Sequence, residues 1–595
     1  MTRVEAKAAH TRALSGLREM GAAWLWVPTG AVVIVLLAEV LSPYWVFLAI
    51  TAVVSSLALL GLGVVSGSAG MISLCQMSFA AVGGWIVAKL NELSFPGGLL
   101  VWILLAGLAT VPFGILIGLP ALRLRGIHLA VVTLGFAAAG DSLLQQIGFP
   151  GASNYRPITR PALVASDRNY LIMSGLVFMA VAAALAAVNR RRAGAAWRMV
   201  RFSERATAAA GYSVARTKLT AFAISAFIAG VSGGLLAGQI GLLSAQSFSV
   251  SQSLLLYVLA MMLGTQYVEG AVAGGVLSMV VMALLTRYSV NQNWSGVLFG
   301  AGAIQALATG SSLSEDLRLR LAARRAAGMS DTESGGVCAA APAALVARAA
   351  VVPATRPAYS PLLAVRGLTV RYGAVTALNE VTLTVPAGVV MGLIGPNGAG
   401  KSTLADAVSG FIGCDAGTVE LGGVSLAGQA VPERARAGIR RTFQQARVPP
   451  SLTVGEYIRF AAGRRIDQIS MRELLRYLDC PQPEQSIRVV DAGTRRMLEI
   501  VGILLSEPKL VILDEPAAGL GHTGSGILGE RLATIPATFG ASLLLIEHDL
   551  DLIRVCCSTV AVLDFGKVIA EGEPADVLAR AEVTAAYLGD VGAVQ

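Results

Sequence analysis

Residues 389–403 read VVMGLIGPNGAGKST and decide the fold of the second half of the chain. The apolar run 389–394 is typical of a buried strand. It leads directly into the residues that carry the pattern G-x-x-x-x-G-K-[ST]: Gly395, Pro396, Asn397, Gly398, Ala399, Gly400, Lys401, Ser402 and Thr403. Glycines let backbone N–H groups turn inward around a phosphate chain, and the following helix offers its positive end. The sequence therefore predicts a phosphate-binding loop between a strand and a helix.

Two side chains at the end of this loop have distinct predicted roles. Lys401 adds a cation near the terminal phosphates of a nucleotide, and the hydroxyl of Ser402 is a ligand for Mg²⁺. We therefore expect ATP and Mg²⁺ to bind here as cofactors.

A second buried strand ends in two carboxylates. Residues 510–516 read LVILDEP, which is a Walker B arrangement. A carboxylate at the carboxyl end of a strand can hold Mg²⁺, which suits Asp514. The next carboxylate can orient and deprotonate the attacking water, which suits Glu515. The pattern predicts an ATP hydrolase.

With these motifs, residues 362 to 588 resemble the ATPase subunit of ABC transporters. The resemblance implies an α/β P-loop ATPase domain over residues 362–595. It also implies that Tyr372 stacks on adenine and that Gln444, in RTFQ, meets Mg²⁺ and couples the ATPase to transport. By the same resemblance His548, in IEHD, is the switch histidine that contacts the γ-phosphate.

One motif departs from the family pattern. Where ABC ATPases have an LSGGQ-like signature, residues 490–494 read VDAGT, so that Asp491 replaces a serine that binds the γ-phosphate of the opposite subunit. Two like charges near 4 Å repel by about 1 kcal/mol in water and about 4 kcal/mol at an effective dielectric near 20. Asp491 is also a good helix N-cap, and both interpretations stay open. Gly521 likewise stands where the family usually has Asn or Asp.

This departure leads to a hypothesis about assembly. In the family, each ATP lies between the phosphate loop of one subunit and the signature of the other. A homodimer would then have two impaired sites. With a different partner whose signature is intact, the site that uses Lys401 and Glu515 hydrolyses ATP, and the one that uses Asp491 is degenerate.

The first half of the chain has a different composition. Of the 595 residues of the whole chain, 55% are hydrophobic and 14% charged, whereas a soluble protein has roughly 25% charged residues. Between residues 219 and 312 only Glu269 and Arg287 carry a formal charge. These values exclude a purely soluble protein.

A helix needs about 20 mostly apolar residues to cross a bilayer. The sequence predicts a polytopic α-helical membrane domain at residues 23–312, with about ten transmembrane helices. They are expected near residues 23–40, 44–65, 71–90, 99–119, 127–147, 170–188, 219–241, 254–268, 271–285 and 297–309. An Ala- and Pro-rich linker at 313–361 would join this domain to the ATPase domain.

Basic residues indicate the orientation, since Lys and Arg are retained on the cytoplasmic side. The segment 190–218 contains many arginines and one acid, Glu204. With an even number of spans, the N-terminal segment 1–22 and the ATPase domain are both cytoplasmic. These loops account for much of the net charge of +9, so nucleic acid is not an expected partner.

Three stretches of the membrane half resemble the permease subunits of branched-chain amino acid type ABC importers. They are SGSAGMISL at 66–74, GLPALRLRG at 118–126 with TLGF at 133–136, and AAAGY at 208–212 with KLTAF at 218–222. The resemblance favours residues 197–212 as a coupling helix that receives motion from the ATPase, although a loop that only fixes topology is the alternative.

The two resemblances together imply a fused half-transporter. It would import branched-chain amino acids or related small polar solutes, driven by ATP, across a bacterial cytoplasmic (inner) membrane. The implied partners are a second permease, a second ABC ATPase, an extracytoplasmic solute-binding protein and membrane lipid. The alternatives are an ABC exporter and a regulatory membrane protein gated by ATP.

Overall fold

The computed structural model describes residues 26–588, apart from 153, 292–293, 310–311, 319, 321–360 and 520–521. The chain divides into two compact units. The helical unit comprises residues 1–197 and 215–333, and the α/β unit comprises residues 198–214 and 334–595. The predicted N-terminal segment 1–22 and most of the predicted linker 313–361 lie outside the described residues.

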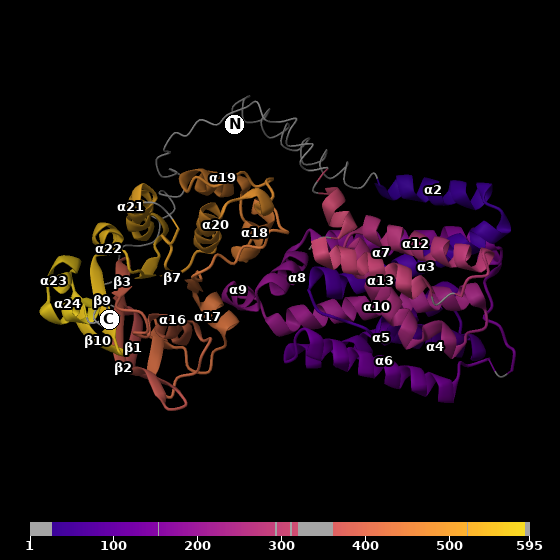
Figure 1. The fold of residues 1–595 in the computed structure, drawn as a ribbon, viewed down its shortest axis with the longest axis horizontal. Coiled ribbons are helices and arrows are strands. Elements are labelled where there is room, and N and C mark those ends of the chain that lie inside the picture. The colour runs from indigo at the N-terminus through magenta and orange to yellow at the C-terminus, as the bar shows by residue number, and fades with distance from the viewer. Residues whose placement is uncertain are drawn as a thin grey trace, which may run out of the picture. The chain divides into compact units, whose positions relative to one another are not determined.

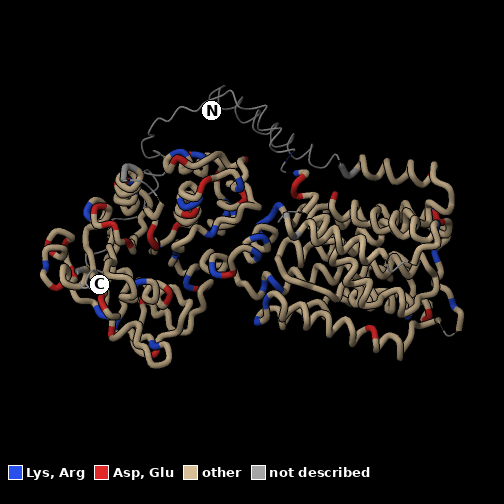
Figure 2. Tube along the Cα trace, viewed as in Figure 1, with Lys and Arg blue, Asp and Glu red and all other residues tan. Residues whose placement is uncertain are grey.

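The helical unit is built from apolar helices that lie roughly alongside one another (Figure 1). Charged residues gather near the ends of these helices and few lie along them (Figure 2). The helices are α2 (Trp26–Val40), α3 (Pro43–Leu62) with the π-helix η1 (Gly63–Ser68), α4 (Gln76–Glu92), α5 (Gly98–Gly118), η2 (Pro120–Leu122), α6 (Ile127–Ile147), η3 (Ala162–Val164), α7 (Asp167–Asn189), α8 (Arg192–Phe202), α9 (Glu204–Ala209), α10 (Val214–Ile240), η4 (Ala245–Phe248), α11 (Val250–Leu263), α12 (Val268–Arg287) and α13 (Trp294–Thr309). Of these, α9 belongs to the α/β unit and α8 runs into it.

Seven helical stretches in the described residues are long and apolar enough to cross a membrane. They contain α3, α5, α6, α7, α10, α11 and α12. The other three predicted spans coincide with α2, α4 and α13, which are shorter at 15, 17 and 16 residues. The count of about ten spans is therefore not confirmed.

Close packing of small residues holds the helical unit together. The most apolar window of α3 is 72% buried and that of α10 is 67% buried, so these two helices form its centre. A Cβ atom at Gly233 of α10 would lie 1.8 Å from the carbonyl oxygen of Ala80 in α4. At Gly83 it would lie 2.2 Å from the carbonyl oxygen of Gly230. Only glycine permits this approach of the two backbones.

The α/β unit contains two sheets and a helical lobe. The first sheet has the strand order β2-β1-β4-β5, and the second has the order β10-β9-β3-β8-β7-β6. In the second sheet β6, β7, β8, β3 and β9 run parallel, and β10 pairs antiparallel with β9. Figure 1 shows α18, α19 and α20 gathered in a lobe away from β1 and β2.

The strands of this unit are β1 (Pro361–Tyr372), β2 (Val375–Pro386), β3 (Val390–Ile394), β4 (Ala416–Leu421), β5 (Val424–Ser425), β6 (Ile439–Arg441), β7 (Leu510–Asp514), β8 (Ser542–Ile546), β9 (Thr559–Asp564) and β10 (Lys567–Gly572). Its helices are α16 (Lys401–Ser409), α17 (Val431–Ala437), α18 (Val454–Ala461), α19 (Gln468–Tyr477), η5 (Ile487–Val489), α20 (Ala492–Leu504), α21 (His522–Phe539), α22 (Leu550–Cys556), α23 (Pro574–Leu578) and α24 (Ala581–Leu588).

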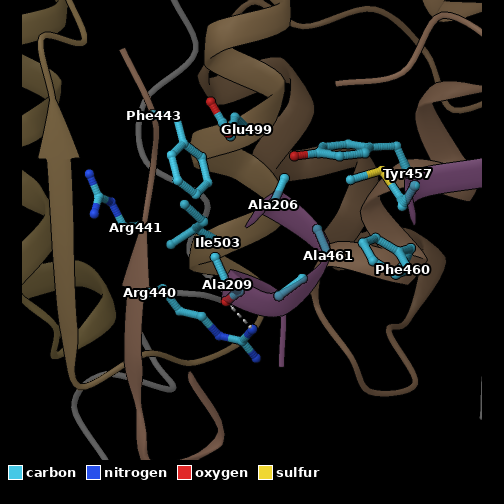
Figure 3. Close-up of a pocket in the computed structure, with 12 residues that line it drawn as sticks. Ala206, Ala209, Arg440, Arg441, Phe443, Tyr457, Phe460, Ala461, Glu499 and Ile503 are labelled. Carbon is cyan, nitrogen blue, oxygen red and sulfur yellow. Dashed lines mark hydrogen bonds between the residues drawn. The ribbon is translucent and has the colours of Figure 1, made fainter. Parts of the chain in front are cut away.

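Residues 198–214 pack on the α/β unit, although they lie between two spans in the sequence. The ring of Tyr212 stacks on that of Phe460 with centroids 4.4 Å apart, and its hydroxyl donates to the Phe460 carbonyl oxygen at 3.1 Å. Arg440 donates to the carbonyl oxygen of Ala209 at 3.2 Å (Figure 3). The segment is thus held by polar contacts as well as by an aromatic stack.

A small cavity of about 30 Å³ beside this segment has a buried carboxyl group in its wall. Glu499 of α20 is 4% exposed, and in the described part of the chain its Oε2 has no hydrogen-bond partner. Burial raises the pKa of Glu499 to about 8, while the backbone N–H of Arg447 and the guanidinium groups of Arg496, Arg447 and Arg441 act in the opposite direction. The carboxyl group therefore keeps its proton at neutral pH in the folded chain.

We expect Gly233→Ala to destabilise the helical unit by about 1–3 kcal/mol, because the added methyl group overlaps the carbonyl oxygen of Ala80. The melting temperature of the purified chain in detergent measures this effect. Gly135→Ala in α6 is the matched control, since a Cβ atom there meets nothing within 4 Å. Equal melting temperatures for the two variants would contradict the packing argument.

Glu499 makes the stability of the chain depend on pH. Its carboxyl group loses its proton near pH 8 in the folded chain but near pH 4.3 in an unfolded chain. The folded state binds more protons between these values, so stability falls as pH rises from about 4 to 8. We expect Glu499→Gln to melt about 2–4 °C higher than the unsubstituted chain at pH 8.5, and to lose this advantage at pH 5.

Melting curves at the two pH values test this expectation. Glu484→Gln is the control, because Glu484 is a mostly exposed acid paired with Arg472. A gain in melting temperature that is the same at pH 5 and pH 8.5 would rule out Glu499 as the source of the pH dependence.

Candidate active site

The predicted phosphate loop connects the buried strand β3 to helix α16. Three of its glycines, Gly395, Gly398 and Gly400, have φ angles of 146°, 81° and 104°. A Cβ atom at Gly395 would lie 2.0 Å from the carbonyl oxygen of Leu563, and one at Gly400 would lie 2.7 Å from that of Ala377. Only glycine can follow this path, because side chains at these positions would be strained or would clash.

Lys401 lies inside the curve of the loop. Its Nζ donates to the carbonyl oxygens of Gly395 at 2.6 Å and Pro396 at 2.9 Å. Partial burial lowers the pKa of Lys401, while the nearby carboxylates of Glu515 and Asp514 act to raise it. The ammonium group is therefore close to both predicted acids.

The first of the two acids, Asp514, is the last residue of strand β7, whose residues are all buried, and Glu515 follows it. Asp514 is 5% exposed, and its backbone N–H donates to the hydroxyl of Thr442 at 3.0 Å. Burial raises the pKa of Asp514, and Arg441, whose Nη2 donates to its carboxylate at 3.2 Å, acts to lower it. Glu515 has a φ angle of 49°, a left-handed conformation that is unusual for a side chain with a Cβ atom.

Gln444 joins the acid pair from the loop that follows β6. Its Nε2 donates to the Glu515 carboxylate at 3.2 Å. Arg496, from the first turns of α20, fixes the backbone of both residues, since it donates to the carbonyl oxygens of Gln444 and Glu515. It also donates to the carbonyl oxygen of Ala518 at 3.1 Å. Arg496 thus links the loop after β6 to the loop after β7.

His548 follows strand β8, and its side chain is about two-thirds exposed. The preceding residue, Glu547, is 1% exposed and accepts hydrogen bonds from the backbone N–H groups of Ala517 at 3.0 Å and His548 at 3.2 Å. Burial raises the pKa of Glu547, and the nearby Glu515 acts in the same direction. Glu547 therefore fixes the chain after β7 relative to the chain after β8.

The structure brings Lys401, Gln444, Asp514 and Glu515 together: Gln444 is hydrogen bonded to Glu515, and the charges of Asp514 and Glu515 act on Lys401. Tyr372 is 54% exposed at the end of β1, and in the described residues no hydrogen bond or ring contact joins it to the other predicted site residues. Ser402 is exposed in the first turn of α16. Gly521 lies outside the described residues.

Asp491 is the N-cap of α20, as one of the two interpretations predicted. Its carboxylate accepts hydrogen bonds from the backbone N–H of Thr494 at 2.9 Å and from its hydroxyl at 2.5 Å. The hydroxyl of Thr494 and its backbone N–H hold the pKa of Asp491 below its usual value. The side chain therefore carries a full negative charge at neutral pH.

Four residues at this site were not predicted from the sequence: Arg441, Arg496, Glu547 and Tyr587. Tyr587 lies in α24, and its hydroxyl accepts a hydrogen bond from the backbone N–H of Gly395 at 2.8 Å. Of these, only Arg441 and Glu547 belong to recognisable motifs, as the first residue of RTFQ and the second of IEHD. Nothing in the sequence near Arg496 or Tyr587 points to the loop that each contacts.

The residues present fit a nucleotide with Mg²⁺. The loop offers backbone N–H groups, a helix N-terminus and the Lys401 ammonium group to phosphate. Ser402, Gln444 and Asp514 contribute hydroxyl, amide and carboxylate oxygens, which are the ligand atoms that Mg²⁺ prefers. No cluster of three or more His, Cys, Asp or Glu side chains in the described residues forms a metal cage by itself. A site with few carboxylates is typical of Mg²⁺ held jointly by the protein and phosphates.

Two family models match the chain. The model for the ABC transporter family matches residues 378–518, and the model for the branched-chain amino acid transport system permease component matches residues 44–307.

Curated relatives match the second half of the chain. The high-affinity branched-chain amino acid transport ATP-binding protein BraF of Pseudomonas aeruginosa is 32% identical over 251 residues, which cover 39% of this chain and 98% of BraF. The corresponding protein LivG of Escherichia coli is 31% identical over 251 residues, with the same shares covered. The Nod factor export ATP-binding protein I of Ralstonia nicotianae is 31% identical over 245 residues, which cover 40% of this chain and 75% of that protein.

These matches place a permease and an ATP-binding subunit in one polypeptide. Since it covers 98% of a relative that is 32% identical and also carries the permease match, the chain belongs to the branched-chain amino acid family of ABC transporters and couples ATP hydrolysis to transport.

Proposed function

We propose that this chain is one half of an ABC importer for branched-chain amino acids or related small polar solutes. The observation that carries the proposal is the union, in one chain, of a permease match over residues 44–307 and an ATP-binding match over residues 378–518. The names of BraF and LivG, which refer to high-affinity branched-chain amino acid transport, support this solute class.

The proposed nucleotide site assigns a role to each predicted residue. The loop and Lys401 bind the phosphates, Tyr372 stacks on adenine, and His548 contacts the γ-phosphate. Mg²⁺, held by Ser402, Gln444 and Asp514, would neutralise the charge that develops on the phosphates during hydrolysis. The residues that bind nucleotide or metal are Tyr372, Gly395, Pro396, Asn397, Gly398, Ala399, Gly400, Lys401, Ser402, Thr403, Gln444 and Asp514.

Glu515 is the proposed general base. It orients a water molecule toward the γ-phosphate and takes up the proton that this water loses. The hydrogen bond from Gln444 holds its carboxylate. Gln444 lies in the loop after β6, and its neighbour Phe443 lines the cavity beside residues 198–214. A movement of this loop would therefore change the position of the base.

Exposed apolar helices of the helical unit support two of the proposed partners, a second permease and membrane lipid. The most apolar window of α6 is 17% buried and that of α12 is 28% buried, against 72% for α3. A second permease or membrane lipid would cover these apolar helices. A second ABC ATPase would complete the nucleotide site, and an extracytoplasmic binding protein would deliver the solute.

The chain is membrane-embedded, and we place it in a bacterial cytoplasmic membrane with its ATPase domain on the cytoplasmic side. Residues 198–214 carry arginines and pack on the ATP-binding unit. Both properties suit a cytoplasmic coupling segment.

Two observations favour other functions. The likeness to an ATP-binding protein whose name refers to Nod factor export favours an exporter. The charge of Asp491 disfavours closure of two identical subunits around ATP, which suits either a different ATPase partner or a regulatory protein with weak hydrolysis.

Substitution of the base tests the proposed function. We expect Glu515→Gln to lower solute-stimulated ATP hydrolysis at least 100-fold, because the amide cannot accept the proton. The measurement uses the chain in lipid with its partner subunits and a loaded solute-binding protein. Glu530→Gln on the exposed face of α21 is the control and should retain full activity. Rapid hydrolysis by the chain alone, indifferent to a binding protein, would contradict import and favour an exporter.

A second experiment tests the charge of Asp491. Asparagine is also a good N-cap, so Asp491→Asn removes the charge and preserves the start of α20. In a Glu515→Gln background we expect this substitution to increase ATP-driven association of two chains about 5- to 10-fold, measured by light scattering in nanodiscs. Unchanged association would show that the charge does not oppose closure.

A further inference from the structure

Arg205 forms an ion pair that links residues 198–214 to the rest of the α/β unit. Its Nη2 lies 2.6 Å from both carboxylate oxygens of Asp406, which belongs to α16, the helix that begins at the phosphate loop. The side chain of Arg205 is 53% exposed and that of Asp406 is 20% exposed. The pair therefore sits at the edge of the unit, where a moving segment can make or break it.

Asp406 has a second cationic partner. Nη1 of Arg441 donates to Oδ1 of Asp406, while Nη2 of the same guanidinium donates to Oδ2 of Asp514 at 3.2 Å. The side chains of Arg441 and Asp514 are 4% and 7% exposed. One buried guanidinium thus connects the carboxylate bound by Arg205 to the carboxylate proposed to hold Mg²⁺.

Two aromatic rings fix the geometry of both arginines. Phe411 and Phe443 pack edge to face with centroids 5.9 Å apart. The guanidinium carbon of Arg205 lies 4.5 Å from the Phe411 centroid, and that of Arg441 lies 5.0 Å from the Phe443 centroid. Arg441 and Phe443 are also in the wall of the cavity beside residues 198–214 (Figure 3). The rings restrict both guanidinium groups.

We propose that Arg205, Asp406 and Arg441 form an ion-pair chain through which docking of residues 198–214 sets the position of Asp514. This inference rests on the proposed nucleotide site and deepens it. While Arg205 holds Asp406, the guanidinium of Arg441 bridges both carboxylates. Without Arg205, Arg441 is the remaining cationic partner of Asp406 among the residues that the structure describes, and a forked pair with both oxygens draws Nη2 away from Asp514.

The consequence concerns the metal ligand. Once Asp514 loses its bond to Arg441, its carboxylate can rotate, and a ligand that must first be ordered binds its metal less tightly. Arg205, Asp406 and Arg441 are therefore positioning residues. The charge of Asp406 is essential to this proposal, because a neutral side chain would not attract Arg441.

The binding of Mg²⁺ together with nucleotide tests the proposed ion-pair chain, and this measurement does not require transport. The full chain in nanodiscs, with Glu515→Gln to stop hydrolysis, is titrated with MgCl₂ at a fixed concentration of a fluorescent ATP analogue. We expect Arg205→Ala to raise the Mg²⁺ concentration for half-maximal binding about three- to tenfold. Arg205→Lys should restore part of this loss, because lysine keeps the charge but lacks the planar guanidinium group that lies over Phe411.

Arg198→Ala is the matched control. Arg198 lies in the same segment and pairs with Glu456 of α18 at 3.3 Å, whereas Arg205 pairs with Asp406, the carboxylate that Arg441 connects to Asp514. We expect it to leave the Mg²⁺ dependence unchanged. A double-mutant cycle adds the second criterion: in an Asp406→Asn background, Arg205→Ala should have no further effect.

Three results would overturn the inference. They are an unchanged Mg²⁺ dependence in Arg205→Ala, an equal shift in Arg198→Ala, and a full effect of Arg205→Ala in the Asp406→Asn background. The last two would indicate a general effect of docking. Failure of the unsubstituted chain to bind the ATP analogue would instead overturn the proposed nucleotide site, and the inference with it.

Discussion

Hydrogen-bonded alignment of the buried strands β3, β7 and β8 determines where every charged group of the nucleotide site lies. In this register Leu393 pairs with Ile546, and Ile546 pairs with Asp514. The phosphate loop follows β3, the Glu547-His548 pair follows β8, and the two acids are the last residue of β7 and the residue after it. Because the carboxyl ends of parallel strands share one edge of the sheet, groups far apart in the chain meet there.

The polar interior behind this edge obeys a second constraint. A buried charge without a partner costs several kcal/mol, so each buried ion at the site must be paired or hydrogen bonded. Arg441 lies between Asp406 and Asp514, and Arg496 is held by backbone carbonyl oxygens of the loops after β6 and β7. Such groups can move only together with their partners. The site is therefore sensitive to the segment 198–214, which supplies one member of the ion-pair chain.

The helical unit is surrounded by lipid and not by water, and this determines how its helices are stabilised. In lipid the backbone must satisfy its own hydrogen bonds, so the unit consists of helices. Since lipid is as apolar as the side chains, helices associate through close approach, which the glycines of α4 and α10 allow. The two units are thus stabilised in different ways. Residues 198–214 lie within the sequence of the membrane half but pack as part of the α/β unit.

The sequence by itself determined the phosphate loop, the acid pair, the family and the positions of the apolar helices, because these features depend on local patterns of spacing and hydropathy. It predicted the N-cap role of Asp491 for the same reason. The number of spans was not determined, since α2, α4 and α13 are too short to decide by length. The tertiary structure alone decided the roles of Arg441, Arg496 and Glu547 and the pairing of Arg205 with Asp406. The last two residues are 201 positions apart in the chain. A local sequence pattern cannot predict a contact between residues that only folding brings together.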